Sequence, residues 1–230
     1  MKKRFKIGLP FWKIGENSFG STLSYVDFIS KFGEIVPLMP DHEIVEDLDL
    51  LVIPGGADIN PAMYGRRPGL FTQKPDIYKD YFDAMYLPKY VEMNVPVFGI
   101  CRGAQAINVL FDGILIQDMY HETNKAEDPY SGVHKIIFTS EADSLKIPNL
   151  KGKTLNVNSR HHQAISKKFL NKDLAVIATH EDGTVEMIAH RTKPIVGVQF
   201  HPEDCNEKNC NLFVATVINM LLTEKQSIMQ

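Results

Sequence analysis

The sequence lacks any run of about 18 consecutive apolar residues, the length that a membrane-spanning helix requires. We therefore expect no part of the chain to cross a membrane. It also has few cysteines, three in 230 residues, an odd number without the spacing of a disulfide framework. The basic residues at positions 2–4 precede an apolar stretch too short for the core of a signal peptide. These features predict a cytoplasmic protein.

A strong net charge is absent as well. The formal charge is −3 at pH 7 and the isoelectric point is near 6.2, which gives no reason to expect a nucleic-acid partner. Internal repeats, low-complexity tracts and an obvious linker are also missing. A hydrophobic share of 44% is ordinary for a globular protein that buries its core without metals or disulfides. We therefore expect one domain over residues 1–230.

What the sequence does contain is an alternation of short apolar runs with helical patterns. Apolar residues at helical spacing predict helices over residues 22–32, 78–93, 102–110 and 206–222, with a break near Pro88. Strands are predicted over residues 6–9, 34–38, 48–53, 95–100, 113–117, 135–138, 154–158, 175–179, 184–188 and 195–200. Strands that alternate with helices predict an α/β fold of three layers, with a mostly parallel central sheet between flanking helices.

The sharpest local feature is Phe98-Gly99-Ile100-Cys101-Arg102-Gly103, with a cysteine midway between two glycines. A buried strand ends there and a helix begins, which is the arrangement of a nucleophile elbow. The helix N-terminus would favour the thiolate form of Cys101 through its positive partial charge. The alternative is a small buried thiol without a chemical role.

A base for such a nucleophile could come from Gly197-Val198-Gln199-Phe200-His201-Pro202-Glu203. Positions two apart in an extended segment project the same way, so Glu203 could fix the ring of His201. The alternative is a histidine in a surface loop with a solvated carboxylate. A zinc site of His201, Cys205 and Cys210 is disfavoured because it lacks a fourth ligand and a tighter cysteine pair.

Two further segments suit a site at the carboxyl edge of a parallel sheet. Pro54-Gly55-Gly56 follows a predicted strand, and its backbone N–H groups could face a developing oxyanion. The pair His161-His162 invites a metal-site interpretation, but consecutive residues of a strand point to opposite faces, so no metal site is predicted.

Together these segments resemble the class I glutamine amidotransferases, and within them the branch that contains γ-glutamyl-γ-aminobutyrate hydrolase. The matching segments follow in the family's order and span nearly the whole chain: PGGADINPAMYG, VPVFGICRGAQAINVLFDGILIQDM, VNSRHHQAI, EDGTVEMIA and IVGVQFHPE. The resemblance implies the flavodoxin-like fold of that family.

The resemblance also implies roles for single residues. Cys101 would be the nucleophile, His201 the general base and acid, and Glu203 the carboxylate that orients the imidazole. The backbone N–H groups of Gly56 and Arg102 would form the oxyanion hole. The residues implied to hold the glutamyl end of the substrate are Gln105, Ser159, Arg160 and His161.

The activity implied is hydrolysis of the γ-glutamyl amide bond of a γ-glutamyl-amine through a glutamyl thioester, without metal or organic cofactor. One alternative is a glutaminase that supplies ammonia to a separate synthetase partner. Another is a catalytically silent binding protein of the same fold. The lack of a fused synthetase favours the hydrolase, and the complete Cys, His and Glu set argues against the silent protein. The oligomeric state, a homodimer included, stays open.

The chain departs from the family pattern in Lys79-Asp80 and Asp83, where an Arg-Asp and a Glu are commoner. These positions are expected on the leaving-group side, so they bear on the substrate. Residues 64–76, with Arg66 and Arg67, could shape a leaving-group pocket or form a solvated surface.

Overall fold

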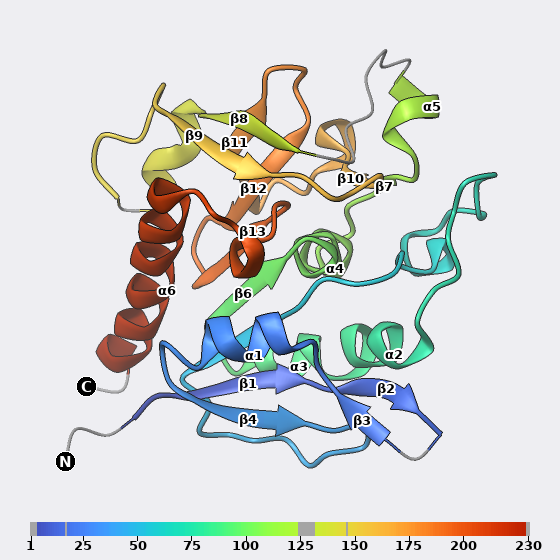
Figure 1. Ribbon diagram of the computed structural model, residues 1–230, viewed down its shortest axis with the longest axis vertical. Helices are drawn as coiled ribbons and strands as arrows, with labels where there is room; N and C mark the ends of the chain where they lie inside the picture. Colours follow the sequence, from blue (N-terminus) through green and yellow to red (C-terminus); the bar gives the residue numbers. More distant parts are fainter. Residues whose placement is uncertain (1–3, 17, 124–131, 146, 229–230) are drawn as a thin grey trace.

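A sheet runs through the middle of the protein, and helices cover both of its faces (Figure 1). This computed structural model describes residues 4–16, 18–123, 132–145 and 147–228. The predicted three-layer α/β fold, a largely parallel central sheet between flanking helices, is confirmed. The strands predicted from the sequence are present, with ends that differ by a few residues.

One half of the sheet is parallel, as predicted. Its neighbours in order are β4 (Glu34–Leu38), β1 (Lys6–Pro10), β5 (Leu50–Ile53), β6 (Val97–Ile100) and β13 (Ile195–Val198). In this register Ile53 lies beside Gly99, and Ile100 lies beside Val198. The chain therefore leaves β5, β6 and β13 at the same edge of the sheet, which is where an open α/β sheet binds its ligand.

The other half of the sheet is antiparallel, a direction that had not been assigned from the sequence. It continues from β13 through β12 (Val185–His190), β11 (Leu174–His180), β8 (Val133–Phe138) and β9 (Thr154–Asn158). Two short strands, β7 (Leu115–Ile116) and β10 (Ala164–Ile165), join this half at β12. In Figure 1 these strands occupy the upper part of the molecule and β1 and β4 the lower part.

Alternate residues of the buried strands face two separate apolar cores. Leu50 and Val52 of β5 join the core under α1 (Leu23–Ile29) and α6 (Lys208–Ile228). Leu51 and Ile53 join the core under α2 (Ile77–Met85), α3 (Leu87–Glu92) and α4 (Arg102–Leu110). This alternation with period two places helices on both faces of the sheet. The predicted break near Pro88 is present, because α2 ends at Met85 and α3 begins at Leu87.

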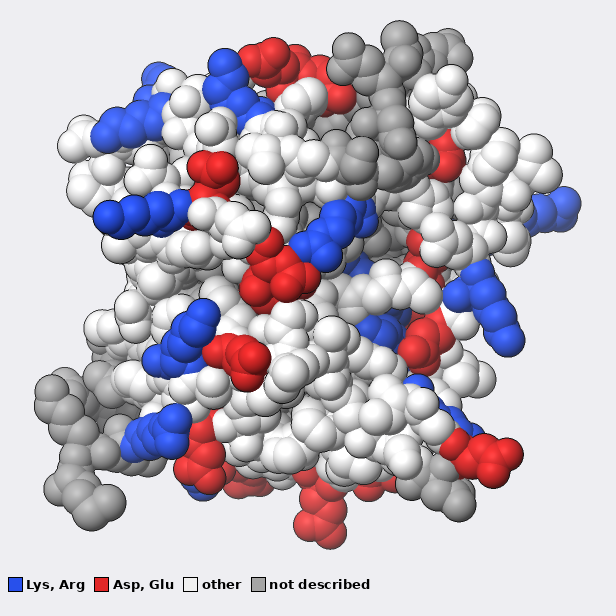
Figure 2. Space-filling model, in the orientation of Figure 1, with Lys and Arg blue, Asp and Glu red and all other residues white. Residues whose placement is uncertain are grey.

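Some short elements had not been predicted. They are the hairpin of β2 (Trp12–Gly15) and β3 (Ser18–Gly20), helix α5 (Met119–Thr123) and the 3₁₀ turns η1 (Pro61–Tyr64), η2 (Ser140–Leu145), η3 (Lys167–Phe169) and η4 (Pro202–Asp204). Within the described residues, no helix combines the length and apolar composition that crossing a bilayer demands. Acidic and basic side chains are interspersed over the face shown in Figure 2.

Candidate active site

Cys101 occupies the sharp turn between β6 and α4, as the glycine-flanked motif predicts. Its backbone angles are φ 51° and ψ −106°, a combination that residues with a Cβ rarely adopt. The turn is tight because Gly99 and Gly103 approach each other closely; a Cβ atom on Gly99 would lie 2.6 Å from the Gly103 carbonyl. The flanking glycines therefore allow the chain to turn so sharply, and the backbone strain sits on Cys101.

His201 and Glu203 lie at the same sheet edge, just beyond β13. The Nδ1 atom of His201 is 2.6 Å from Oε1 of Glu203, and the side chain of Glu203 is 2% exposed. We had expected this contact to come from an extended segment. Residues 202–204 instead form the 3₁₀ turn η4. Asn158 holds the backbone of His201 from both sides, accepting from its N–H at 2.8 Å and donating to its carbonyl at 2.9 Å.

The imidazole of His201 is hydrogen-bonded to Glu203 and interacts electrostatically with Cys101, and both neighbours affect its pKa. Burial lowers the pKa of His201, but the hydrogen bonds to Cys101 and Glu203 and their negative charges outweigh burial and raise it to about 10. The imidazolium form is therefore stabilised beside the sulfur. A sulfur and an imidazole one hundred positions apart in the chain thus meet at one edge of the sheet.

These side chains open into a pocket of about 490 Å³, within the range of small-molecule sites. Its lining includes Tyr25, Gly56, Lys79, Cys101, Arg160 and His201. Cationic and anionic groups both reach this pocket, since Asp76 and Asp204 line it as well.

Gly56 and Arg102, the residues predicted to form an oxyanion hole, flank the elbow from two sides. Gly56 follows β5 and lines the pocket with Cys101. Arg102 is the first residue of α4, so its N–H has no partner within the helix. Among the described residues, neither N–H donates a hydrogen bond. The oxyanion hole itself stays a prediction.

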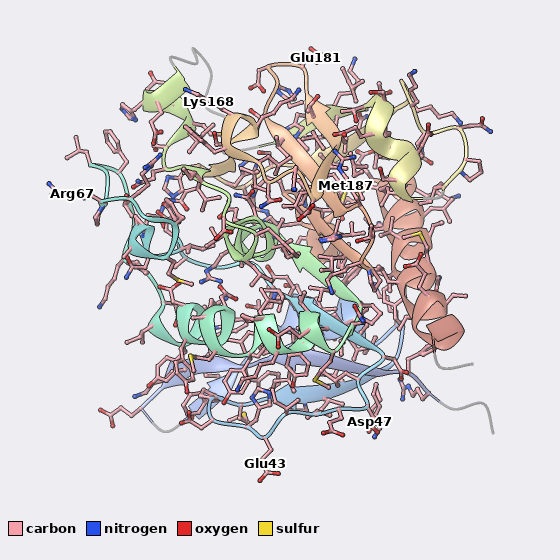
Figure 3. All side chains as sticks on the ribbon, turned by 180° about the vertical axis from the view of Figure 1, so that it is seen from behind. Glu43, Asp47, Arg67, Lys168, Glu181 and Met187 are labelled. Carbon is pink, nitrogen blue, oxygen red and sulfur yellow. The ribbon has the colours of Figure 1, made fainter. Side chains whose placement is uncertain are left out.

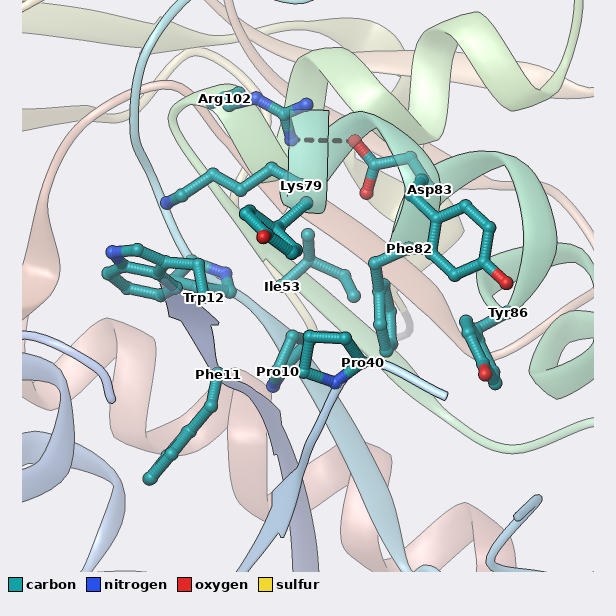
Figure 4. A pocket seen from close by; sticks show the side chains of 13 residues that line it. Pro10, Phe11, Trp12, Pro40, Ile53, Lys79, Phe82, Asp83, Tyr86 and Arg102 are labelled. Carbon is teal, nitrogen blue, oxygen red and sulfur yellow. Dashed lines mark hydrogen bonds and ion pairs between the residues drawn. The ribbon is translucent and has the colours of Figure 1, made fainter. Parts of the chain in front are cut away.

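The side chain of Arg102 forms ion pairs with two aspartates of α2. Its guanidinium is buried and binds Asp80 at 2.7 Å. It also binds Asp83 at 2.6 Å (Figure 4). We had expected both aspartates on the leaving-group side, but neither is among the described residues that line the pocket with Cys101. Their ion pairs with Arg102 instead connect α2 to the first residue of α4. Their neighbour Lys79 does line the pocket.

Of the residues predicted to hold the glutamyl group, Arg160 lines the pocket, whereas Gln105 is buried outside its lining. The amide of Gln105 is 3% exposed and donates to Oε1 of Gln199 at 3.2 Å. Gln199 in turn points its Nε2 at Sγ of Cys101, 3.6 Å away. Gln105 is therefore linked to the sulfur through Gln199.

The other two predicted residues, Ser159 and His161, are also buried outside the pocket lining. The Nε2 atom of His161 lies 3.6 Å from the buried carboxylate of Glu186. We had expected His161 and His162 to lie on a strand. They instead follow β9, which ends at Asn158. His162 turns the other way and pairs with Asp58 at 2.8 Å.

The predicted leaving-group segment, residues 64–76, contributes to a second hollow of about 420 Å³. Phe71 and Gln73 line it, and Arg160 borders both hollows. Arg66 and Arg67 are exposed, and Arg67 lies at the outer edge of the molecule (Figure 3). Within the described residues, no three His, Cys, Asp or Glu side chains are grouped to hold a metal ion.

Sequence reasoning had assigned no role to Tyr25 or Gln199, and it had expected Lys79 only on the leaving-group side; all three contact this site. The Tyr25 hydroxyl accepts from the Gly55 N–H at 3.0 Å, and burial and the nearby Glu203 raise the pKa of Tyr25. Gln199 could have been found, because it belongs to the GVQFHPE segment. Tyr25 gave no local signal, since its role depends on a contact thirty residues away.

The sequence and the fold are similar to those of known proteins. The model of the peptidase C26 family matches residues 11–203. The glutamine amidotransferase-like protein YvdE of Lactococcus lactis is 32% identical over 207 residues, which cover 84% of each chain. A glutamine-hydrolyzing GMP synthase subunit of Thermococcus kodakarensis is 32% identical over 135 residues, 58% of this chain and 64% of that protein. Among solved structures, a GMP synthase subunit of Thermoplasma acidophilum aligns over 100% of both chains, with a TM-score of 0.68 and 21% identity.

Proposed function

The chain belongs to the peptidase C26 family, and from this premise we propose that it is a cysteine hydrolase that cleaves the γ-glutamyl amide bond of a γ-glutamyl-amine. The observation that carries the proposal is the position of His201, which is hydrogen-bonded to Glu203 and lines the same pocket as Cys101, the residue that helps to raise its pKa. A nucleophile, its base and a group that orients the base are the parts that acyl transfer requires.

In this reaction the thiolate of Cys101 attacks the δ-carbonyl carbon of the γ-glutamyl group. The oxyanion that forms binds the N–H groups of Gly56 and Arg102, each worth about 3 kcal/mol in the transition state. His201 gives its proton to the departing amine, and the C–N bond breaks to leave a glutamyl thioester. Water then attacks the thioester, with His201 as base, and releases glutamate and the free thiol.

The charges of the pocket suit the glutamyl end of such a substrate. An amino acid carries an ammonium and a carboxylate, and the ion pair of Asp204 and Arg160, 2.9 Å apart at the pocket lining, offers a partner for each. A volume of about 490 Å³ leaves room for a substituted amine as well as for the glutamyl group.

A second function, the glutaminase of an amidotransferase, has support of its own. The similar protein of Thermococcus kodakarensis is one subunit of a glutamine-hydrolyzing GMP synthase. On this alternative the chain hydrolyses glutamine itself and supplies ammonia to a separate synthetase. Its rate would then depend on that partner, whereas the free-standing hydrolase needs none.

Glutamate release from a panel of γ-glutamyl-amines and from glutamine tests the proposal. We expect the isolated protein to prefer substituted amides and Cys101→Ala to release no glutamate. Preference for glutamine, with a rate raised by a synthetase, would support the glutaminase instead. No release from any amide, with Cys101 still open to alkylation, would point to a silent binding protein.

A further inference from the structure

Lys79 is a buried lysine whose ammonium reaches the edge of the proposed active site. It comes from α2, is 9% exposed, and its Nζ atom donates a hydrogen bond to the carbonyl oxygen of Gly55. The same atom lies 3.6 Å from the centre of the Trp12 ring, which covers it from the side of the hairpin (Figure 4). A buried ammonium needs such partners, because losing its hydration is costly.

The carbonyl that Lys79 binds belongs to the peptide that supplies the Gly56 N–H. A planar trans peptide directs its C=O and its N–H to opposite sides. An ammonium that holds the Gly55 oxygen therefore turns the Gly56 N–H away from itself. Among the described residues that N–H has no other hydrogen-bond partner, so it is available to a ligand of the pocket.

We propose that Lys79 is a positioning residue for the oxyanion hole: it fixes the Gly55–Gly56 peptide so that the Gly56 N–H faces the oxyanion. The inference rests on the proposed acyl transfer, because only that reaction creates the oxyanion. It assigns Lys79 no contact with the reacting atoms. Its effect passes through the peptide that it holds.

Side chains pack closely around Gly55 and Gly56. A Cβ atom on Gly56 would collide with the Nζ atom of Lys79. A Cβ atom on Gly55 would lie 2.6 Å from the Tyr25 hydroxyl and 3.1 Å from the His201 ring. A side chain at either glycine would therefore displace Lys79 or Tyr25, which hold the Gly55 backbone from its carbonyl and its N–H.

The strength of the hydrogen bond from Lys79 to the Gly55 carbonyl should depend on pH. Burial and the charge of Arg102 lower the pKa of Lys79 to about 7, against the opposing effects of Asp76, Asp83 and Cys101. The ammonium thus predominates below about pH 7 and is lost as the pH rises through that value. A neutral amine donates a weaker hydrogen bond than an ammonium, so the peptide is held less firmly.

Two substitutions separate positioning from packing. Lys79→Met keeps an apolar stem but removes the donor, and Lys79→Arg keeps a permanently charged donor. Lys193→Met is the matched control, because Lys193 also donates to a backbone carbonyl, that of Val91, and lines a different hollow. Each variant is assayed for kcat and KM with γ-glutamyl-p-nitroanilide and for alkylation of Cys101 by iodoacetamide, a displacement that forms no oxyanion.

For Lys79→Met we expect kcat to fall about 10- to 100-fold, part of the loss that follows removal of an oxyanion donor, with KM and alkylation nearly unchanged. Lys79→Arg should restore most of kcat. It should also move the decline of kcat from near pH 7 toward the pKa of His201, about 10. Lys193→Met should match the wild type.

A wild-type kcat in Lys79→Met would overturn this inference but not the proposed function. The same holds if Lys79→Arg neither restores kcat nor changes its pH profile. Equal losses of kcat and of alkylation would overturn it in favour of a packing role. If Lys79→Met does not fold, the pH profile of Lys79→Arg decides. A wild-type protein that cleaves no γ-glutamyl amide would overturn the proposed function, and this inference with it.

Discussion

The Nδ1 atom of His201 lies 2.6 Å from Oε1 of Glu203, and the same imidazole shares a pocket with Cys101, which helps to raise its pKa. The ring therefore connects a carboxylate of its own turn with a sulfur from a distant part of the chain. Because the carboxyl ends of β6 and β13 are neighbours in a parallel pair, the sheet itself brings them together.

Removal of the sulfur should lower the pKa of His201. In Cys101→Ala the hydrogen bond and the negative charge of Cys101 are lost, while burial continues to favour the neutral ring. An NMR titration of the imidazole should show a pKa well below about 10. Cys205→Ala, which removes a buried thiol outside the pocket lining, should leave it unchanged. A His201 pKa that stays the same in Cys101→Ala would show that the two side chains do not interact.

Loss of the carboxylate should cost less activity than loss of the imidazole. His201→Ala removes the proton carrier, whereas Glu203→Gln leaves a side chain that can still accept from Nδ1. By analogy with other triads, we expect the loss of kcat in Glu203→Gln to be roughly two orders of magnitude smaller. Glu207→Gln, the same chemical change outside the pocket lining, is the control. Equal or reversed losses would contradict the assigned roles.

The strained turn at Cys101 should be visible in stability. Cys101→Gly and Cys101→Ala both lack the thiol, but only glycine adopts a φ of 51° with a ψ of −106° without strain. Relief of about 1–3 kcal/mol, less the flexibility that glycine adds to the unfolded chain, should make Cys101→Gly more stable by about 1 kcal/mol. Urea unfolding measures the difference. A glycine variant no more stable than the alanine variant would argue against strain at this turn.

His162 should stabilise the fold in a pH-dependent manner. Hydrogen bonds to Asp58, and secondarily to Asp118, raise the pKa of His162 above its ordinary value of 6.5. Its contribution to the free energy of unfolding is therefore full below pH 6.5 and is lost as the pH rises through the folded-state pKa. Urea unfolding of wild type and His162→Gln should differ more at pH 6 than at pH 9.

His42 offers the opposite control, because burial lowers its pKa. Its contribution should be present above pH 6.5 and should decline as the pH falls below that value. The difference between wild type and His42→Gln should therefore grow from pH 6 to pH 9. The same pH trend for both histidines would contradict the assignment at His162.

The sequence predicted the parts of the fold that depend on local pattern. Continuous apolar runs marked β5, β6 and β13, and the glycines around Cys101 marked the turn into α4. The hairpin of Trp12–Gly15 and Ser18–Gly20 was missed because its strands are short and mostly exposed. The antiparallel direction of β11 and β12 was also missed, although the short connections between β11, β12 and β13 indicate it. The pairing of β8 with β11 was not predictable, since it joins segments that are distant in the chain.

The candidate site shows the same division. Cys101, His201 and Glu203 belong to motifs that the sequence displays, and the sheet brings them together. Lys79 and Tyr25 hold the Gly55 backbone from two different helices, and no local pattern marks such contacts. The burial of Gln105 outside the pocket lining could not be predicted, because it depends on a contact with Gln199, which lies 94 positions further along the chain.

Mass spectrometry of the protein quenched during turnover of a γ-glutamyl amide tests the central claim most directly. We predict a mass gain of one glutamyl group, carried by the peptide that contains Cys101 and absent from Cys101→Ala. A glutamyl adduct on Cys205 or Cys210, or turnover that continues without the thiol of Cys101, would contradict the account.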